Sequence, residues 1–164
     1  MVLLKEAISR DTDTPPHPKQ ANWHAIEWRQ AVQTVRRLQV RIVKAVKAGN
    51  WKKVRDLQRL LGRSYSARVL AVRRVTENAG KKTAGVDKVV WNKAEEKASG
   101  IERLKERQYQ AQPLRRVYIP KKNGELRGLG IPTMVDRAKQ AHHQLALDPV
   151  AETGADPNSY GFRA

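Results

Sequence analysis

Four cationic side chains lie close together around a short turn signal in the last third of the sequence. Lys121 and Lys122 precede the dipeptide Asn123-Gly124, Arg127 follows it, and Arg116 lies a few residues upstream. Ammonium and guanidinium groups bind anions, and an arginine can hold two phosphate oxygens at once. The segment therefore needs an anionic partner, and its charges need a defined local structure to hold them.

The residues around this turn predict a β-hairpin. Leu114–Ile119 contains side chains that suit a pleated strand, and Leu126–Ile131 forms a second short run after the turn. Asn-Gly can adopt the two positive φ angles of a type I′ turn, which is the strongest short-range hairpin signal. Because a two-stranded unit is marginally stable by itself, we expect the hairpin to pack on another part of the chain.

A two-residue turn would also decide which side chains share a face of the hairpin. It would pair Lys121 with Leu126 and Ile119 with Gly128. Lys121 and Arg127 would then lie on opposite faces, whereas a wider turn would bring them together. The two-residue register places on one face Arg116, Tyr118, Lys122 and Arg127, and on the other Val117, Ile119, Gly128 and Gly130.

Apolar residues at three- and four-residue steps predict three closely connected helices before the hairpin. The first begins near Trp28 and ends at Gly49-Asn50, the second begins at Trp51, and Ser64 can cap the third. We expect the apolar stripes of these helices to form a core. Its predicted members are Trp28, Val32, Val35, Leu38, Ile42, Ala45, Val46, Trp51, Val54, Leu57, Leu60, Leu61, Ala67, Leu70, Ala71 and Val75.

Two further helices are expected on either side of the hairpin. Lys93–Arg107 is a helix candidate with a small apolar face, and Thr133 can cap a helix that carries Asp136 in its first turn. Pro149 should bend or interrupt that last helix. The predicted fold class is α+β and mostly α, with a basic helical subdomain, a β-hairpin and a further helix.

The charge balance points to a polyanion. The 164 residues contain 33 Lys and Arg against 16 Asp and Glu, a formal net charge of +17, and Arg29–Lys82 alone holds 16 cations and only the acids Asp56 and Glu77. Aromatic residues make up 5% of the chain, which favours contacts with phosphates of a structured nucleic acid over stacking on bases. The candidate RNA-binding residues are Arg36, Arg37, Arg41, Lys44, Lys52, Lys53, Arg73, Arg74, Lys81 and Lys82.

Other kinds of site find little support in the sequence. The chain has no cysteine, and its four histidines have no metal-ligand spacing. The glycine-bearing loop Asn78–Asp87 does not match the nucleotide-binding P-loop, and Asp87 is expected to cap a turn. No apolar run could span a membrane and Met1–Gln20 is not a signal peptide, so we expect an intracellular, cytoplasmic protein without a membrane partner. The residues give no complete active site.

Several stretches, in this order, resemble the N-terminal part of group II intron reverse transcriptase/maturases. They are Trp23–Trp28, Leu38–Lys47, Ala71–Asp87, Pro113–Thr133 with Asp136-Arg137-Ala138, and Ser159–Arg163. The resemblance implies a helical N-terminal region that binds intron RNA and template-primer, and a fingers hairpin that contacts the phosphates of the incoming nucleotide. On this hairpin it assigns phosphate contacts to Lys121 and Arg127, with Arg116 as a secondary candidate and Lys122 able to share the role. The family usually has proline where this chain has Gly128, which gives the strand more backbone freedom.

The resemblance also implies a domain organisation. It divides the chain into a disordered leader (1–22), a helical reverse-transcriptase N-terminal domain (23–108) and the start of the fingers (109–164), truncated before the palm. The family's catalytic carboxylates lie in the palm, so we expect no catalytic or metal-binding residue here, Mg²⁺ only in the full-length family, and no polymerase activity from this chain alone. The parent would be an RNA-directed DNA polymerase, a nucleotidyltransferase of a mobile element that also assists splicing.

Two other interpretations remain open on the sequence. The segment could act alone as an RNA-binding or RNA-chaperone module without enzymatic activity. It could also be a DNA-binding helical protein unrelated to polymerases, although the hairpin and Ser159–Arg163 argue against this. Oligomeric state does not follow from the residues.

Overall fold

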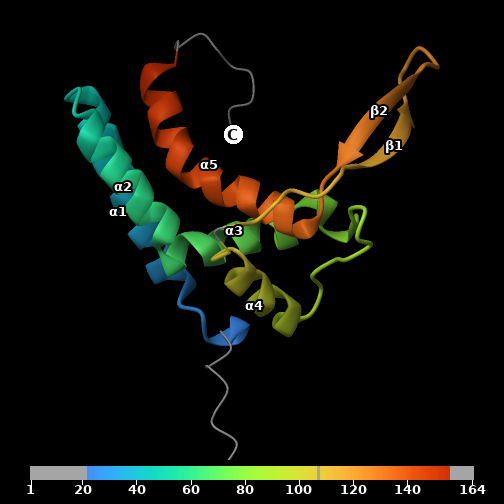
Figure 1. The fold of residues 1–164 in the computed structure, drawn as a ribbon, viewed down its shortest axis with the longest axis horizontal. Helices are drawn as coiled ribbons and strands as arrows, with labels where there is room; N and C mark the ends of the chain where they lie inside the picture. Colours follow the sequence, from blue (N-terminus) through green and yellow to red (C-terminus); the bar gives the residue numbers. More distant parts are fainter. Residues whose placement is uncertain (1–21, 107, 156–164) are drawn as a thin grey trace, which may run out of the picture.

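The computed structural model describes residues 22–106 and 108–155. Figure 1 shows a mostly helical α+β fold, which confirms the predicted fold class. The predicted motif Ser159–Arg163 and all of the predicted leader except Asn22 lie outside the described residues. The elements in chain order are η1 (Trp23–Ala25), α1 (Trp28–Lys47), α2 (Trp51–Arg63), α3 (Tyr65–Glu77), η2 (Ala79–Lys82), α4 (Ala94–Arg103), β1 (Arg115–Pro120), β2 (Leu126–Ile131) and α5 (Met134–Gly154).

Local signals set the helix boundaries where the sequence predicts them. Gly49 ends the first helical segment with a φ of 66°, a conformation that suits glycine. The side-chain oxygen of Asn50 then accepts a 3.0 Å hydrogen bond from the backbone N–H of Lys53, which caps α2. Ser64 caps α3 in the same way, through a 3.0 Å bond from the backbone N–H of Ala67.

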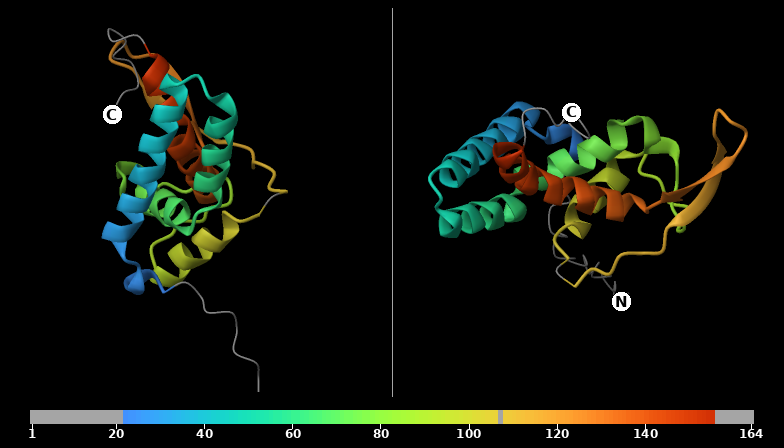
Figure 2. Two further views of the ribbon diagram at one scale, coloured as in Figure 1. Left: turned by 90° about the vertical axis from the view of Figure 1, so that its left-hand side faces the viewer. Right: turned by 90° about the horizontal axis from the view of Figure 1, so that it is seen from above.

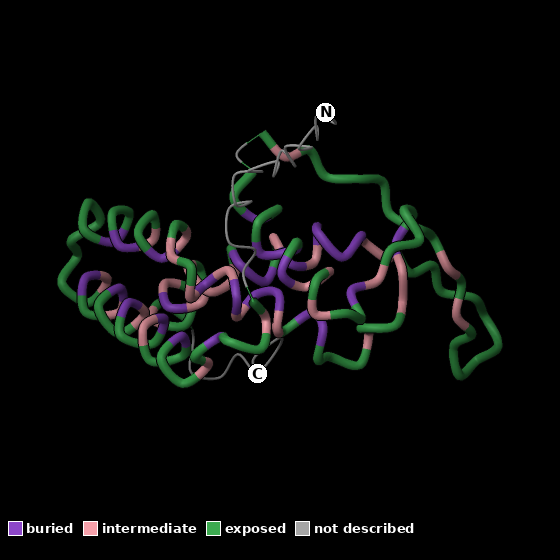
Figure 3. Tube along the Cα trace, turned by 90° about the horizontal axis from the view of Figure 1, so that it is seen from below, coloured by how far each residue is buried: buried purple, intermediate pink, exposed green. Residues whose placement is uncertain are grey.

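The helices bury two apolar clusters. One lies mainly between α1 and α2 and is centred on Ile42 and Leu61, both fully buried; the other joins α3, α4 and the start of α5. Figure 3 shows buried residues on the sides of α1 and α2 that face each other, and exposed residues on their outer sides. Val32, Trp51 and Leu60 were expected in this core, and that prediction is wrong, because their exposed fractions are 46%, 53% and 51%. Trp51 begins α2 at the turn between the helices and is not part of either cluster.

Helix α5 continues past Pro149 to Gly154, so the predicted interruption does not occur. Proline has no N–H to donate to the carbonyl four residues before it, which here is Leu145. The side-chain amide of Gln39 on α1 donates a 2.9 Å hydrogen bond to that carbonyl instead. Gln58 on α2 donates a 2.9 Å hydrogen bond to the next carbonyl, that of Ala146. Two distant glutamines therefore stabilise the helix where the proline weakens it.

The loop after α3 is fastened to the start of α5. A Cβ atom on Gly85 would lie 2.7 Å from the Cα atom of Thr133, so the two backbones touch. The guanidinium of Arg137 donates hydrogen bonds to the carbonyl oxygens of Gly80 (2.9 Å), Pro132 (3.1 Å) and Thr83. As predicted, Asp87 supports a turn in this loop, since its carboxylate accepts a 3.2 Å bond from the N–H of Val89.

Helix α4 is shorter than predicted. It spans Ala94–Arg103 rather than Lys93–Arg107. Its chain turns away at the C-terminal end, where the N–H of Lys105 bonds to the carbonyl of Glu102 at 2.9 Å, one residue closer than in an α-helix.

The β-hairpin and the α1–α2 turn lie at opposite ends of an elongated molecule. Figure 1 and the right view of Figure 2 show α5 running between them, from the base of the hairpin to the side of α1 and α2. Among the described residues, no helix is long and apolar enough to span a membrane. The fold thus separates the hairpin cations from most of the helical cations.

Candidate nucleic-acid interface

The turn of the β-hairpin has three residues rather than two. The N–H of Lys121 bonds to the carbonyl of Glu125 at 2.7 Å, and the N–H of Gly124 bonds to the carbonyl of Lys121 at 3.1 Å. Of the turn residues, only Gly124 has a positive φ, 84°, so Asn123 does not adopt the type I′ conformation. The turn fits the three-residue class in which a glycine at positive φ follows a tight turn. The prediction of a two-residue turn is wrong, although the hairpin itself is confirmed.

This turn shifts the register by one residue. Ile119 pairs with Arg127, and Tyr118 pairs with Gly128. Because directly paired residues share a face, Arg127 lies on the face of Val117 and Ile119, and Lys121, paired with Glu125 at the loop, continues that face. Arg116 and Tyr118 lie on the opposite face with Gly128 and Gly130. The structure therefore brings Lys121 and Arg127 together and separates both from Arg116.

Lys121 already has a carboxylate partner. Its Nζ atom lies 2.8 Å from Oε2 of Glu125, and both side chains are largely exposed. Hydrogen bonds from Lys121, and then Asn123, hold the pKa of Glu125 below its ordinary value. Glu125 therefore remains an anion that competes with any phosphate for Lys121. Sequence reasoning missed this pairing, whose only signal was the closeness of the two residues across a turn.

A group of helical cations lies on the outer face of α1. Arg36, Arg37 and Arg41 border an open groove of about 500 Å³, together with Gln33 and Val40. All three arginines are exposed. Helical spacing explains the cluster, since residues one turn apart lie on the same face. Lys44 extends it by a further turn.

The other helical candidates are spread over three elements. Lys52 and Lys53 are exposed at the start of α2, Arg74 is exposed on α3, and Lys81 and Lys82 are exposed in η2. Within residues 22–106 and 108–155, no carboxylate lies within 4.0 Å of these five side chains or of the four on α1. Their charges are therefore available to an external anion.

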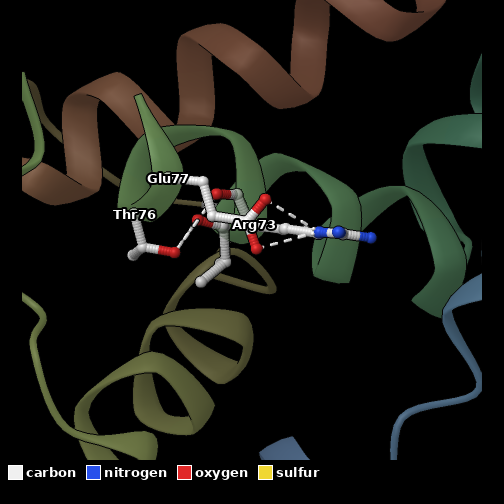
Figure 4. A network of polar contacts seen from close by, with 4 residues as sticks. Arg73, Thr76 and Glu77 are labelled. Carbon is white, nitrogen blue, oxygen red and sulfur yellow. Dashed lines mark hydrogen bonds and ion pairs between the residues drawn. The ribbon is translucent and has the colours of Figure 1, made fainter. Parts of the chain in front are cut away.

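Arg73 differs from the other candidates. Figure 4 shows its side chain beside Glu77, with both carboxylate oxygens 3.0 Å from Nε. Its guanidinium carbon also lies 4.8 Å from the centre of the Trp28 ring, a cation–π contact that holds the start of α1 near α3. The local contacts of Arg73 are those of a structural residue.

A larger open cleft of about 1040 Å³ lies beside the N-terminal half of α5, and sequence reasoning did not find it. His142 lines it, is 7% exposed, and its Nε2 atom has no hydrogen-bond partner among the described residues. Burial, and then the nearby charges of His143, Arg68 and Lys139, lower the pKa of His142 to about 4. The burial of His142 could have been predicted from its position on an apolar helix face with Ala138, Ala141 and Leu145.

Metal ligands do not cluster in the part of the chain that the structure describes. No group of three or more His, Asp or Glu side chains there could hold a metal ion.

Comparisons with known proteins identify the family. Residues 23–104, half of the chain, match the family model of the N-terminal domain of reverse transcriptase. The chain therefore belongs to the reverse transcriptases that carry this domain, as the N-terminal part of a group II intron reverse transcriptase/maturase.

Three curated relatives are each similar to part of this chain. Maturase-like protein 1 of Euglena gracilis is 32% identical over 139 residues, 83% of this chain and 30% of the relative. The group II intron-encoded protein LtrA of Lactococcus lactis subsp. cremoris is 37% identical over 97 residues, 57% of this chain and 16% of the relative. Protein YkfC of Escherichia coli (strain K12) is 53% identical over 55 residues, 34% of this chain and 14% of the relative. The chain thus spans less than a third of the length of each.

Proposed function

We propose that this chain is the RNA-binding N-terminal part of a group II intron RNA-directed DNA polymerase/maturase, and that the outer face of α1 is its main contact with intron RNA. The observation that carries the proposal is the arginine cluster Arg36, Arg37 and Arg41, exposed around one groove without a carboxylate partner among the described residues. Guanidinium groups in this arrangement bind phosphates along a folded RNA. The intron-encoded and maturase-like relatives support RNA as the polyanion.

The hairpin has a separate part in this proposal. Lys121 and Arg127 share one face, and in a polymerase that face would hold the phosphates of an incoming nucleotide beside the template-primer. Residues of a palm would supply the metal-dependent phosphoryl transfer, and Mg²⁺ would bind there. The described residues contribute only the phosphate-binding side chains.

The experiment measures RNA affinity as a function of salt with the full chain. Substituting Arg36, Arg37 and Arg41 together by Gln should weaken binding of a structured RNA about tenfold, and should reduce the slope of log affinity against log salt by about 2 to 3. The matched control substitutes Lys88, Arg103 and Lys105 by Gln, which removes the same charge; Lys105 is already paired with Glu102. A flat salt response, or equal losses in the two triple variants, would contradict the proposal.

A further inference from the structure

The hairpin has a second face, opposite Lys121 and Arg127, that the function proposed above does not use. This face carries an open groove of about 640 Å³, lined by Leu114, Arg116, Tyr118, Gly128 and Gly130. Leu114 and Tyr118 have exposed fractions of 58% and 59%, although both are apolar enough to favour burial. An aromatic ring, an arginine and bare backbone thus meet at one exposed surface.

The two glycines shape this groove. Tyr118 pairs directly with Gly128, and a Cβ atom on Gly128 would lie 3.6 Å from Cε1 of Tyr118. The ring therefore rests over the glycine backbone while much of it stays exposed. At Gly130 a Cβ atom would lie 2.7 Å from Cδ1 of Leu114, so this leucine occupies the space above the second glycine. The backbone thus supports the Tyr118 ring from below.

Arg116 supplies the charge at this surface. It lies two residues before Tyr118 on β1, so both side chains project from the same face, about 7 Å apart along the strand. In the described part of the chain no carboxylate lies within 4.0 Å of Arg116. A phosphate next to a base on Tyr118 would be within reach of this guanidinium.

We propose that this face binds an unpaired strand of RNA, with one base stacked on Tyr118 and a neighbouring phosphate held by Arg116. An exposed aromatic ring beside a cation is the combination that binds single-stranded nucleic acid, because every base has a face that can stack. A base inside a duplex is already stacked on both sides and cannot use the ring. The choice of RNA rather than DNA rests on the proposed function, whereas the stacking geometry of the groove is independent of it.

The test compares a single-stranded RNA with a duplex RNA of the same length, using the full chain. Tyr118→Ala should weaken single-strand binding about tenfold and leave duplex binding within about twofold. Tyr118→Phe, which keeps the ring, should retain the wild-type affinity. A 2-aminopurine base in the single strand should lose fluorescence on binding to the wild type and much less on binding to Tyr118→Ala. The same sequence in DNA is measured in parallel.

Tyr65→Ala is the matched control, since Tyr65 is 44% exposed and lies at the start of α3, away from the hairpin. The inference is overturned if Tyr118→Ala weakens both RNAs equally or neither, if Tyr65→Ala has the same effect, or if the loss appears with DNA alone. A purely structural Tyr118–Gly128 pair would give such an unselective result. Failure of the proposed function has a different signature: the triple substitution on α1 would leave duplex affinity unchanged while the selective effect of Tyr118→Ala persisted.

Discussion

The side-chain amide of Gln39 on α1 donates a 2.9 Å hydrogen bond to the carbonyl oxygen of Leu145 on α5. This is the carbonyl that would bond to residue 149 in an uninterrupted helix, and residue 149 is a proline. One side chain thus replaces a missing backbone donor and joins two helices that are far apart in sequence.

Gln39→Ala should destabilise the protein by about 1 to 3 kcal/mol, because it leaves a partly buried carbonyl without a donor. Urea unfolding followed by circular dichroism measures this loss. In a Pro149→Ala background the backbone N–H returns, so the same substitution should cost clearly less. An equal cost in both backgrounds would show that Gln39 does not act through Leu145.

Gly85→Ala should destabilise the fold by about 1 to 3 kcal/mol. Its Cβ atom would lie 2.7 Å from the Cα and 2.8 Å from the N atom of Thr133, and backbone atoms cannot rotate away. Gly62→Ala is the matched control, because no atom lies within 4 Å of a Cβ there, and alanine in a helix should add up to about 1 kcal/mol. Thermal unfolding of both variants tests the contact, and a neutral Gly85→Ala would contradict it.

Stability should fall between neutral pH and pH 5 because of His142. Its pKa is about 4 in the folded state and 6.5 when unperturbed, so within this window the unfolded state binds more protons. Acidification to pH 5 should therefore remove about 1 to 2 kcal/mol, a value reduced for the open cleft beside the ring. His142→Gln should flatten this dependence in urea titrations. His143→Gln, at an exposed position, should retain most of it, because burial is the main cause of the lowered pKa of His142.

Arg127→Ala in a full-length relative with this hairpin should raise the nucleotide concentration needed for primer extension. Lysine at this position should rescue little, because it cannot hold two phosphate oxygens in the same way. In the present chain the same substitution should leave RNA affinity nearly unchanged, since many other cations contribute. Normal nucleotide use in the relative, with RNA binding lost in this chain, would show that the assignment of Arg127 is wrong.

Helix boundaries were predictable where one residue determines them. Gly49, Asn50 and Ser64 act through their own backbone angles or side-chain oxygens, so the sequence contains the whole signal. The turn was less predictable because Asn-Gly fits two turn classes, and the choice between them shifted every pair of the hairpin by one residue.

Features that depend on distant partners were not predictable. The continuation of α5 through Pro149 requires Gln39 and Gln58, which precede it by about a hundred residues. The cationic faces followed from composition and helical period, whereas the contact of Arg73 with Trp28 required coordinates.

Helix α5 has a consequence for the length of RNA that the chain can use. The hairpin leads into the first residue of α5, Met134, whereas Gln39 on α1 bonds to Leu145, about 16 Å further along the helix. This stretch of α5 lies between the arginine-bearing helix α1 and the hairpin. If both proposals hold, a short oligonucleotide binds either the arginines of α1 or the Tyr118 face, but not both. A longer RNA that reaches both surfaces binds as a bivalent ligand, and its second contact benefits from a high effective concentration. Affinity should then rise in a step, at the length where one molecule first bridges the helix.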